Sequence, residues 1–223
     1  MLVVGVGPAV HATPYRVSNV SQWPARLVGG DVVTITAVNA FDGGVLTVPY
    51  DTSAGDVVIR GERKGSTPVG GVHFVINRSH VTLTGLSFSD TSPVNTPLID
   101  VVNPDAGVPI TGIRLTNLDF VNVGPSTTEP KAISPARRVV TVRALDPENN
   151  PVTDVRLDHS RFSKVNYAIT VLVSNGVRDL RIAEITKLDT VIDGGGVVAF
   201  RARVSLSFKV ESAAPAKKVK GRK

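Results

Sequence analysis

A short pattern of residues recurs in phase along this chain, and it restricts the fold more than any other feature of the sequence. In each copy, apolar residues alternate with polar ones, a corner position follows, and the copy ends on an apolar residue. The clear copies are 81–88, 113–120 and 155–162, and a looser copy starts at Leu180. Helical spacing of apolar residues is nearly absent, apart from a turn or two around Val20–Leu27 that Pro24 interrupts.

The repeat predicts two strands joined by a one-residue corner, which turns the chain without a hairpin. Coils of this kind stack in parallel, about 4.8 Å apart, and several are needed because one coil cannot bury its apolar face alone. The expected inward ladders are Val81, Ile113, Val155 and Leu180, then Leu83, Leu115, Leu157 and Ile182, with a stack of Phe88, Phe120 and Phe162. The corner column holds Gly85, Asn117, His159 and Glu184. Gly and Asn tolerate the left-handed conformation that such a corner needs.

Second strands are expected before the repeats, at 72–76, 98–102, 139–142 and 168–173. The sequence therefore predicts an all-β protein. Its expected fold is a single-stranded, right-handed parallel β-helix over residues 13–211 with a short N-terminal cap. A β-sandwich also consists of short alternating strands, but it would not explain why one pattern recurs in phase.

The two ends of the chain differ from this body. Residues 1–12 are apolar and lack a positively charged start, which leaves either a clipped signal peptide or a strand that caps the core. Residues 212–223 are expected to be a disordered basic tail, because a linker-like stretch leads into Lys217, Lys218, Lys220, Arg222 and Lys223. The net charge is +6, and without the tail the body is nearly neutral. The tail is either a solubilising end or a patch for a polyanion such as nucleic acid.

Composition excludes several classes of function. No apolar run is long enough for a membrane-spanning helix. The chain has no Cys, which excludes disulfides, thiolate zinc sites and a Cys nucleophile. Its four His residues lack ligand-like spacing, so the sequence predicts no metal site and gives no sign of a cofactor. Aromatic residues make up only 5% of the chain, so few side chains are available on which sugars or bases could stack.

Four segments carry a resemblance to a known family. They are Tyr15-Arg-Val17, the Gly-Asp strand at 30–35, the Gly-Asp to Ile-Arg-Gly strand at 55–61, and Val-x-Leu-x-Gly-Leu-x-Phe at 81–88. Over residues 13–190 the chain resembles the first half of the β-helices of polysaccharide lyase family six, the chondroitinase B and alginate lyase type.

The resemblance implies an extracellular, cell-surface or virion-surface protein that acts on an acidic polysaccharide by β-elimination, with calcium as an optional cofactor. The family's later segment with calcium ligands, a Lys base and an Arg has no counterpart here. The chain is therefore either a truncated homologue or a small β-helix with another task.

Outward positions of the repeat supply the predicted substrate-binding residues. One column reads Thr82, Arg114, Arg156 and Arg181, and Asp158 lies beside it. The planar guanidinium fork pairs well with carboxylate or sulfate, so an acidic polysaccharide is the expected partner. The alternative is a surface ladder in which Asp119 and Asp158 offset the stacked positive charges.

The segment 154–167 holds the candidate catalytic residues. A lyase needs a base for the proton beside a carboxylate and a cation for the enolate that forms. Lys164 or His159 could be the base, with Arg161 or Arg156 as the cation, although His159 also fills a corner position. Two functions stay open: a carbohydrate-active or carbohydrate-binding β-helix, and a non-catalytic structural β-helix of a virion, spike or adhesin that is attached through its tail.

Overall fold

The structure, a computed structural model of the chain, describes most residues between 12 and 208. The described ranges are 12–36, 44–63, 66–90, 96–104, 107–124, 138–146, 149–165, 167–172, 180–181, 185–193 and 196–208, with side chains up to Val165. The predicted basic tail and, except for Ala12, the predicted N-terminal segment lie outside these residues.

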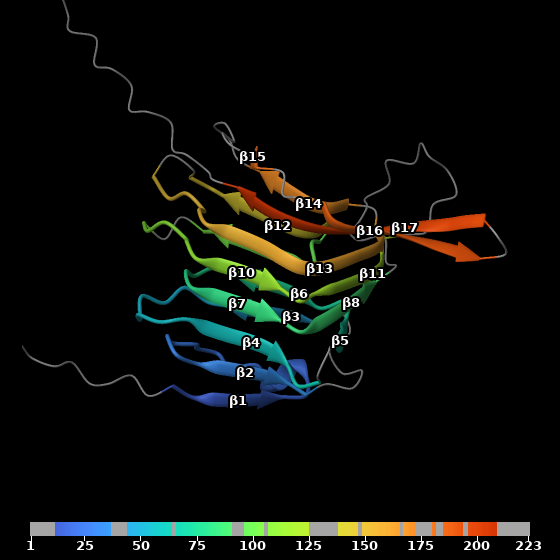
Figure 1. Cartoon of the computed structure of the whole chain (residues 1–223). Coiled ribbons are helices and arrows are strands. Elements are labelled where there is room, and N and C mark those ends of the chain that lie inside the picture. The colour runs from blue at the N-terminus through green and yellow to red at the C-terminus, as the bar shows by residue number, and fades with distance from the viewer. Residues whose placement is uncertain are drawn as a thin grey trace, which may run out of the picture.

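One large sheet contains the strands that the repeat predicts. Its first row runs in the order β1 (Pro14–Val17), β2 (Val32–Ile35), β4 (Val57–Gly61), β7 (Val81–Thr84), β10 (Ile113–Thr116) and β13 (Val155–Val165), all parallel. These strands lie one above the other in Figure 1. A second row runs from the later part of β13 through β11 (Asp119–Val123) and β8 (Leu86–Asp90) to β5 (Thr67–Gly70), again in parallel.

A second parallel sheet contains the strands expected before the repeats. Its order is β3 (Val45–Val48), β6 (His73–Ile76), β9 (Ile99–Asn103), β12 (Arg138–Ala144) and β14 (Tyr167–Leu172). Between β2 and β14 the chain passes repeatedly from the large sheet to this sheet and back, so consecutive coils stack. The protein is all-β with parallel sheets, which is compatible with a β-helix or another solenoid.

The expected corners adopt the left-handed backbone conformation. The φ angles are 68° at Gly85, 52° at Asn117 and 48° at His159. Each of these residues lies at the junction where the chain leaves the first row of the large sheet and enters the second row. In the last coil both rows belong to β13, so this corner falls inside a single long strand. Between β1 and β2, a 3-10 helix (η1, Val20–Gln22) is capped at its C-terminal end by Trp23, just before Pro24.

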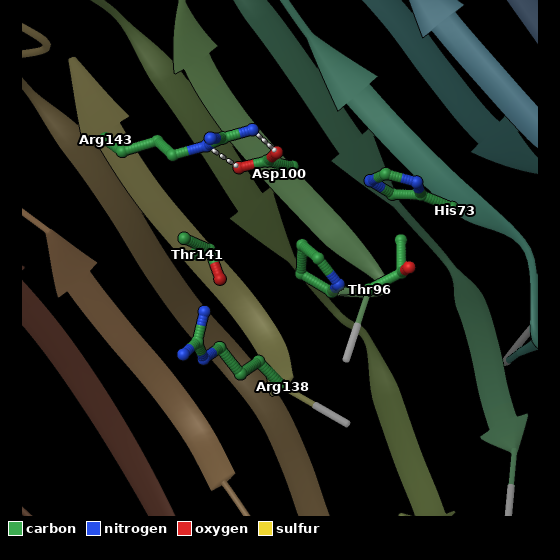
Figure 2. A pocket seen from close by; sticks show the side chains of 7 residues that line it. His73, Thr96, Asp100, Arg138, Thr141 and Arg143 are labelled. Atoms are coloured by element: carbon green, nitrogen blue, oxygen red, sulfur yellow. Dashed lines mark hydrogen bonds and ion pairs between the residues drawn. The ribbon is translucent and has the colours of Figure 1, made fainter. Parts of the chain in front are cut away.

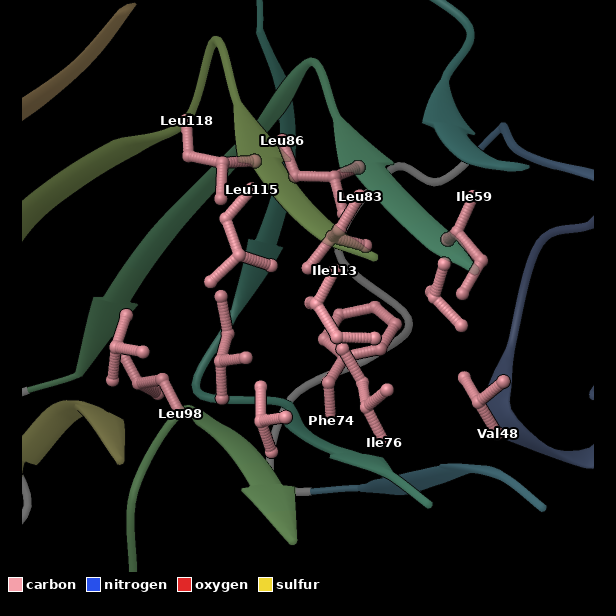
Figure 3. Close-up of a cluster of buried hydrophobic side chains, with 14 of the residues drawn as sticks. Val48, Ile59, Phe74, Ile76, Leu83, Leu86, Leu98, Ile113, Leu115 and Leu118 are labelled. Atoms are coloured by element: carbon pink, nitrogen blue, oxygen red, sulfur yellow. The ribbon is translucent and has the colours of Figure 1, made fainter. Parts of the chain in front are cut away.

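The inward ladders form as the repeat predicts. Val81, Ile113 and Val155 are in register, as are Leu83, Leu115 and Leu157, and all six are buried. Ring centroids are 5.0 Å apart between Phe88 and Phe120 and 4.9 Å apart between Phe120 and Phe162, with nearly parallel planes. Figure 3 shows Leu83, Leu115 and Ile113 of the large sheet facing Phe74 and Ile76 of the second sheet. The core is therefore an apolar interior enclosed by both sheets.

The fourth copy of the repeat does not stack on the third, so this part of the prediction was wrong. β17 (Gly196–Phe208) pairs antiparallel with β13, and β15 (Leu180–Arg181) and β16 (Ile185–Asp193) pair antiparallel with β17. Leu180 is thus separated from Val155 by Phe208. β16 and β17 form an antiparallel hairpin in which Asp193 pairs with Gly196. Strand β17 of this hairpin occupies the edge of β13 on which a further parallel coil would have stacked. Ile182 and Glu184 lie outside the described residues.

No helix among the described residues is long and apolar enough to cross a membrane.

Replacing Leu115 with Asp should test the inward ladder. Leu115 is fully buried between Leu83 and Leu157, so the variant would place an unpaired charge in the core and lower the free energy of unfolding by about 4 kcal/mol or more. Chemical denaturation measures this loss. Thr82→Asp, on the outward face of β7, is the control and should cost far less. If the two variants were equally stable, Leu115 would not be part of a buried ladder.

Candidate functional site

The large sheet brings two of the predicted substrate-binding arginines side by side. Arg114 of β10 and Arg156 of β13 are direct neighbours in the parallel register. Their side chains are 50% and 57% exposed, while the adjacent Leu115 and Leu157 point into the core. Two like charges on neighbouring strands repel each other, so a nearby anion is needed to offset this repulsion.

Asp158 supplies that anion from the next outward position of β13. Its carboxylate Oδ2 lies 2.7 Å from Nε of Arg156 and 3.4 Å from Nη2 of Arg114. The Asp158 side chain is only 1% exposed. Two guanidinium groups therefore share one buried carboxylate. The cluster of Arg114, Arg156 and Asp158 thus keeps a net charge of one positive unit at the surface.

The environment of Asp158 favours its charged form. Burial raises the pKa of this carboxyl, but hydrogen bonds from Thr116 and His159 and the charges of Arg114 and Arg156 together outweigh burial. The pKa of Asp158 is therefore lowered below its ordinary value. A carboxylate held in its charged form can keep both arginines in place over the whole neutral pH range.

His159 is the predicted base that the structure places best. Its Nδ1 lies 3.1 Å from Oδ1 of Asp158, which orients the ring and directs Nε2 away from the pair. The side chain is 60% exposed. His159 also forms the corner of its coil, with a positive φ angle. The residue therefore has a structural role as a corner and is also the candidate base.

The other predicted catalytic residues do not gather around His159. Arg161 makes two hydrogen bonds to Asp119, Nε to Oδ1 at 3.1 Å and Nη2 to Oδ2 at 3.0 Å, as the surface-ladder alternative expected. Lys164 is exposed and has a φ angle of 53°. Within the described part of the chain, no hydrogen bond or ion pair joins His159, Arg161 and Lys164.

The prediction for Arg181 needs a correction. Its register partner is Ser207 of β17, and Ser207 in turn pairs with Arg156. Arg181 therefore shares the phase of the arginine column but is one strand removed from it, because β17 lies between β13 and β15.

The second sheet carries a pocket that the sequence did not predict. It has a volume of about 280 Å³ and lies over β6, β9 and β12. The lining residues are His73, Thr96, Pro97, Asp100, Arg138, Thr141 and Arg143. Figure 2 shows their side chains grouped on one side of the sheet.

An ion pair between the half-exposed Arg143 and the buried Asp100 fixes one side of this pocket. Arg143 donates from Nε to Oδ1 of Asp100 at 3.1 Å and from Nη2 to Oδ2 at 2.7 Å. The hydrogen bond to Asp100 raises the pKa of Arg143, although burial opposes the shift. Such two-point pairs are geometrically rigid, so Arg143 and Asp100 form a fixed, nearly neutral wall.

Two other polar groups of the pocket, on β12, are less satisfied. Thr141 is 2% exposed, and its Oγ1 has no hydrogen-bond partner among the described residues. No described residue forms an ion pair with Arg138. These residues lie on strands outside the in-phase repeat, so no sequence pattern indicated that they would meet.

The described residues contain no group of three or more His, Asp or Glu side chains placed to hold a metal ion. Calcium stays an implication of the family resemblance alone.

No protein-family model matches the chain, and comparisons with curated proteins and with solved structures find no match either. The resemblance to polysaccharide lyase family six therefore stays a prediction from four sequence segments.

The stability of Asp158→Asn relative to the wild type should depend on pH. The pKa of Asp158 is lower in the folded protein than its ordinary value of about 3.9. Its stabilising effect is therefore present above that value and disappears as the pH falls through the folded-state pKa. At pH 7 the variant should lose about 1–3 kcal/mol, because two arginines lose their shared anion.

Urea denaturation across the acidic range measures this difference. The gap between wild type and Asp158→Asn should close as the medium becomes acidic. Asp56→Asn is the control, because the side chain of Asp56 is 69% exposed, and it should cost little stability at pH 7. A gap that stays constant with pH would show that the charge of Asp158 is not what stabilises the fold.

Proposed function

We propose that this protein is a right-handed parallel β-helix that binds an acidic polysaccharide outside the cell or at a cell or virion surface. The in-phase ladders and the left-handed corners support the β-helix, because a sandwich would not stack equivalent positions in parallel register. The four segments that resemble polysaccharide lyase family six support an acidic polysaccharide as the partner.

One observation carries the proposed binding function. Arg114 and Arg156 project from adjacent rungs and share the single carboxylate of Asp158, so the pair keeps a surplus positive charge. Neither guanidinium is saturated by this one contact, since each carries five N–H donors. An acidic chain lying across the strands could offer carboxylate or sulfate groups to both rungs.

If the protein also cleaves its ligand, the dyad of Asp158 and His159 is the best candidate for the base. Asp158 orients the imidazole from the Nδ1 side, and Nε2 would then accept the proton beside the sugar carboxylate. Arg156, next to Asp158, would be the nearest cation for the developing enolate. Screening alginate, chondroitin sulfate and pectate for unsaturated products by ultraviolet absorbance tests this activity.

A structural β-helix is the second candidate, and the cross-strand ion pairs favour it. Arg114 with Asp158, and Arg161 with Asp119, join neighbouring coils across the outer face. Pairs of this kind can serve the fold alone. In that case, the basic tail at 212–223 would be the part that attaches the protein to a polyanion.

The double substitution Arg114→Gln and Arg156→Gln separates the two candidates. Each exposed contact with an acidic glycan is worth about 0.5–1 kcal/mol, so the variant should bind alginate or chondroitin sulfate about tenfold more weakly. The wild-type affinity should also fall as salt is added. Affinity electrophoresis at two salt concentrations measures both effects.

The matched control is the double substitution Arg16→Gln and Arg26→Gln. It removes the same charge from two exposed arginines that form ion pairs elsewhere on the molecule and should leave the affinity nearly unchanged. If the Arg114 and Arg156 variant instead binds as the wild type but melts at a lower temperature, the arginines form a structural ladder and the second candidate takes first place.

A further inference from the structure

The pocket on the second sheet contains a polar atom that the fold itself does not use. Thr141 is 2% exposed, yet its Oγ1 has no hydrogen-bond partner in the described part of the chain. A buried hydroxyl without a partner destabilises a protein, because it has lost its hydrogen bonds to water. A bound ligand that accepts or donates a hydrogen bond at this place would remove the cost.

The charge of the pocket indicates what kind of ligand it suits. Asp100 and Arg143 neutralise each other through their two-point pair. Arg138 also lines the pocket and has no ion-pair partner among the described residues, so its positive charge dominates. In Figure 2 the hydroxyl of Thr141 points towards the guanidinium of Arg138. A hydrogen-bonding group and a cation therefore face the same space.

We propose that this pocket is a second binding site, separate from the arginine pair on the large sheet, for a single oxyanion group on a small ligand. Arg138 would pair with two oxygens of a carboxylate or sulfate, and the Thr141 hydroxyl would donate a hydrogen bond to the same group or accept one from a neighbouring hydroxyl. The ion pair of Asp100 and Arg143 is the rigid wall that fixes the position of the ligand.

The size of the pocket limits the ligand. Its volume of about 280 Å³ lies just below the range for drug-sized small-molecule sites, about 300–1,000 Å³. A group the size of one sugar unit would fit, and a longer chain would have to continue outside. The site does not depend on the proposed function, because its residues belong to β6, β9 and β12 and to the segment before β9.

Three probes that share one sugar ring test the proposal by isothermal titration: glucuronate, glucose 6-sulfate and uncharged glucose. At least one of the two anions should bind to the full chain, and glucose should not. Binding of glucuronate alone would assign the site to carboxylates, and binding of the sulfate ester alone would assign it to sulfates. If neither anion binds, or if glucose binds equally well, the proposal is wrong.

Two variants locate the binding in this pocket. Arg138→Gln should weaken anion binding about tenfold, because it removes the charged fork. Thr141→Val keeps the shape of the side chain but removes the hydroxyl, and it should weaken binding about threefold or more while leaving the melting temperature unchanged or higher. A purely structural Thr141 would show the opposite pattern, with lower stability and unchanged binding, and this result would overturn the proposal.

Three controls complete the design. Thr141→Ser retains the hydroxyl and should bind as the wild type. Arg16→Gln removes one charge far from the pocket in the sequence and should also bind as the wild type. The Arg114 and Arg156 double variant should keep full affinity for the small anion. This control distinguishes a failure of the pocket proposal from a failure of the proposed polysaccharide binding. Equal weakening by every charge-removing variant would indicate non-specific attraction and would refute the site.

Discussion

The structure depends on apolar side chains of one coil packing directly on the equivalent side chains of the next. Val81, Ile113 and Val155 share one register, and the rings of Phe88, Phe120 and Phe162 stack beside them. No coil could bury these groups alone, so each coil is stable only because of its neighbours. The left-handed corners keep the two rows of the large sheet in phase, and this constraint repeats the same inward positions from coil to coil.

The same repetition creates the electrostatic features of the outer face. A register that stacks Leu115 on Leu157 must also stack Arg114 on Arg156, because outward and inward positions alternate along every strand. The repulsion between these arginines is offset by one buried carboxylate, that of Asp158. The basic surface is thus a consequence of how the core is built, whichever ligand it serves.

Much of this could be predicted from the sequence, and the parts that could not have physical causes. The ladders, the aromatic stack and the corners at Gly85, Asn117 and His159 were predictable, because a period repeated three times leaves little choice of register. The position of Leu180 was not, because the fourth copy is loose and competes with a hairpin whose strand β17 takes the free edge of β13. The pocket was also beyond prediction, since Asp100 and Thr141 become neighbours only through the pairing of β9 with β12.

The corner at Gly85 also determines where this protein could change during evolution or be modified in the laboratory. A residue inserted there would move every following side chain to the opposite face of its strand until the next connection, which would exchange core and surface. The connections that enter β9 and β12 already differ in length, while the strands on both sides keep their register. New peptide segments could therefore be accepted on that side of the coil, next to the pocket, without altering the ladder.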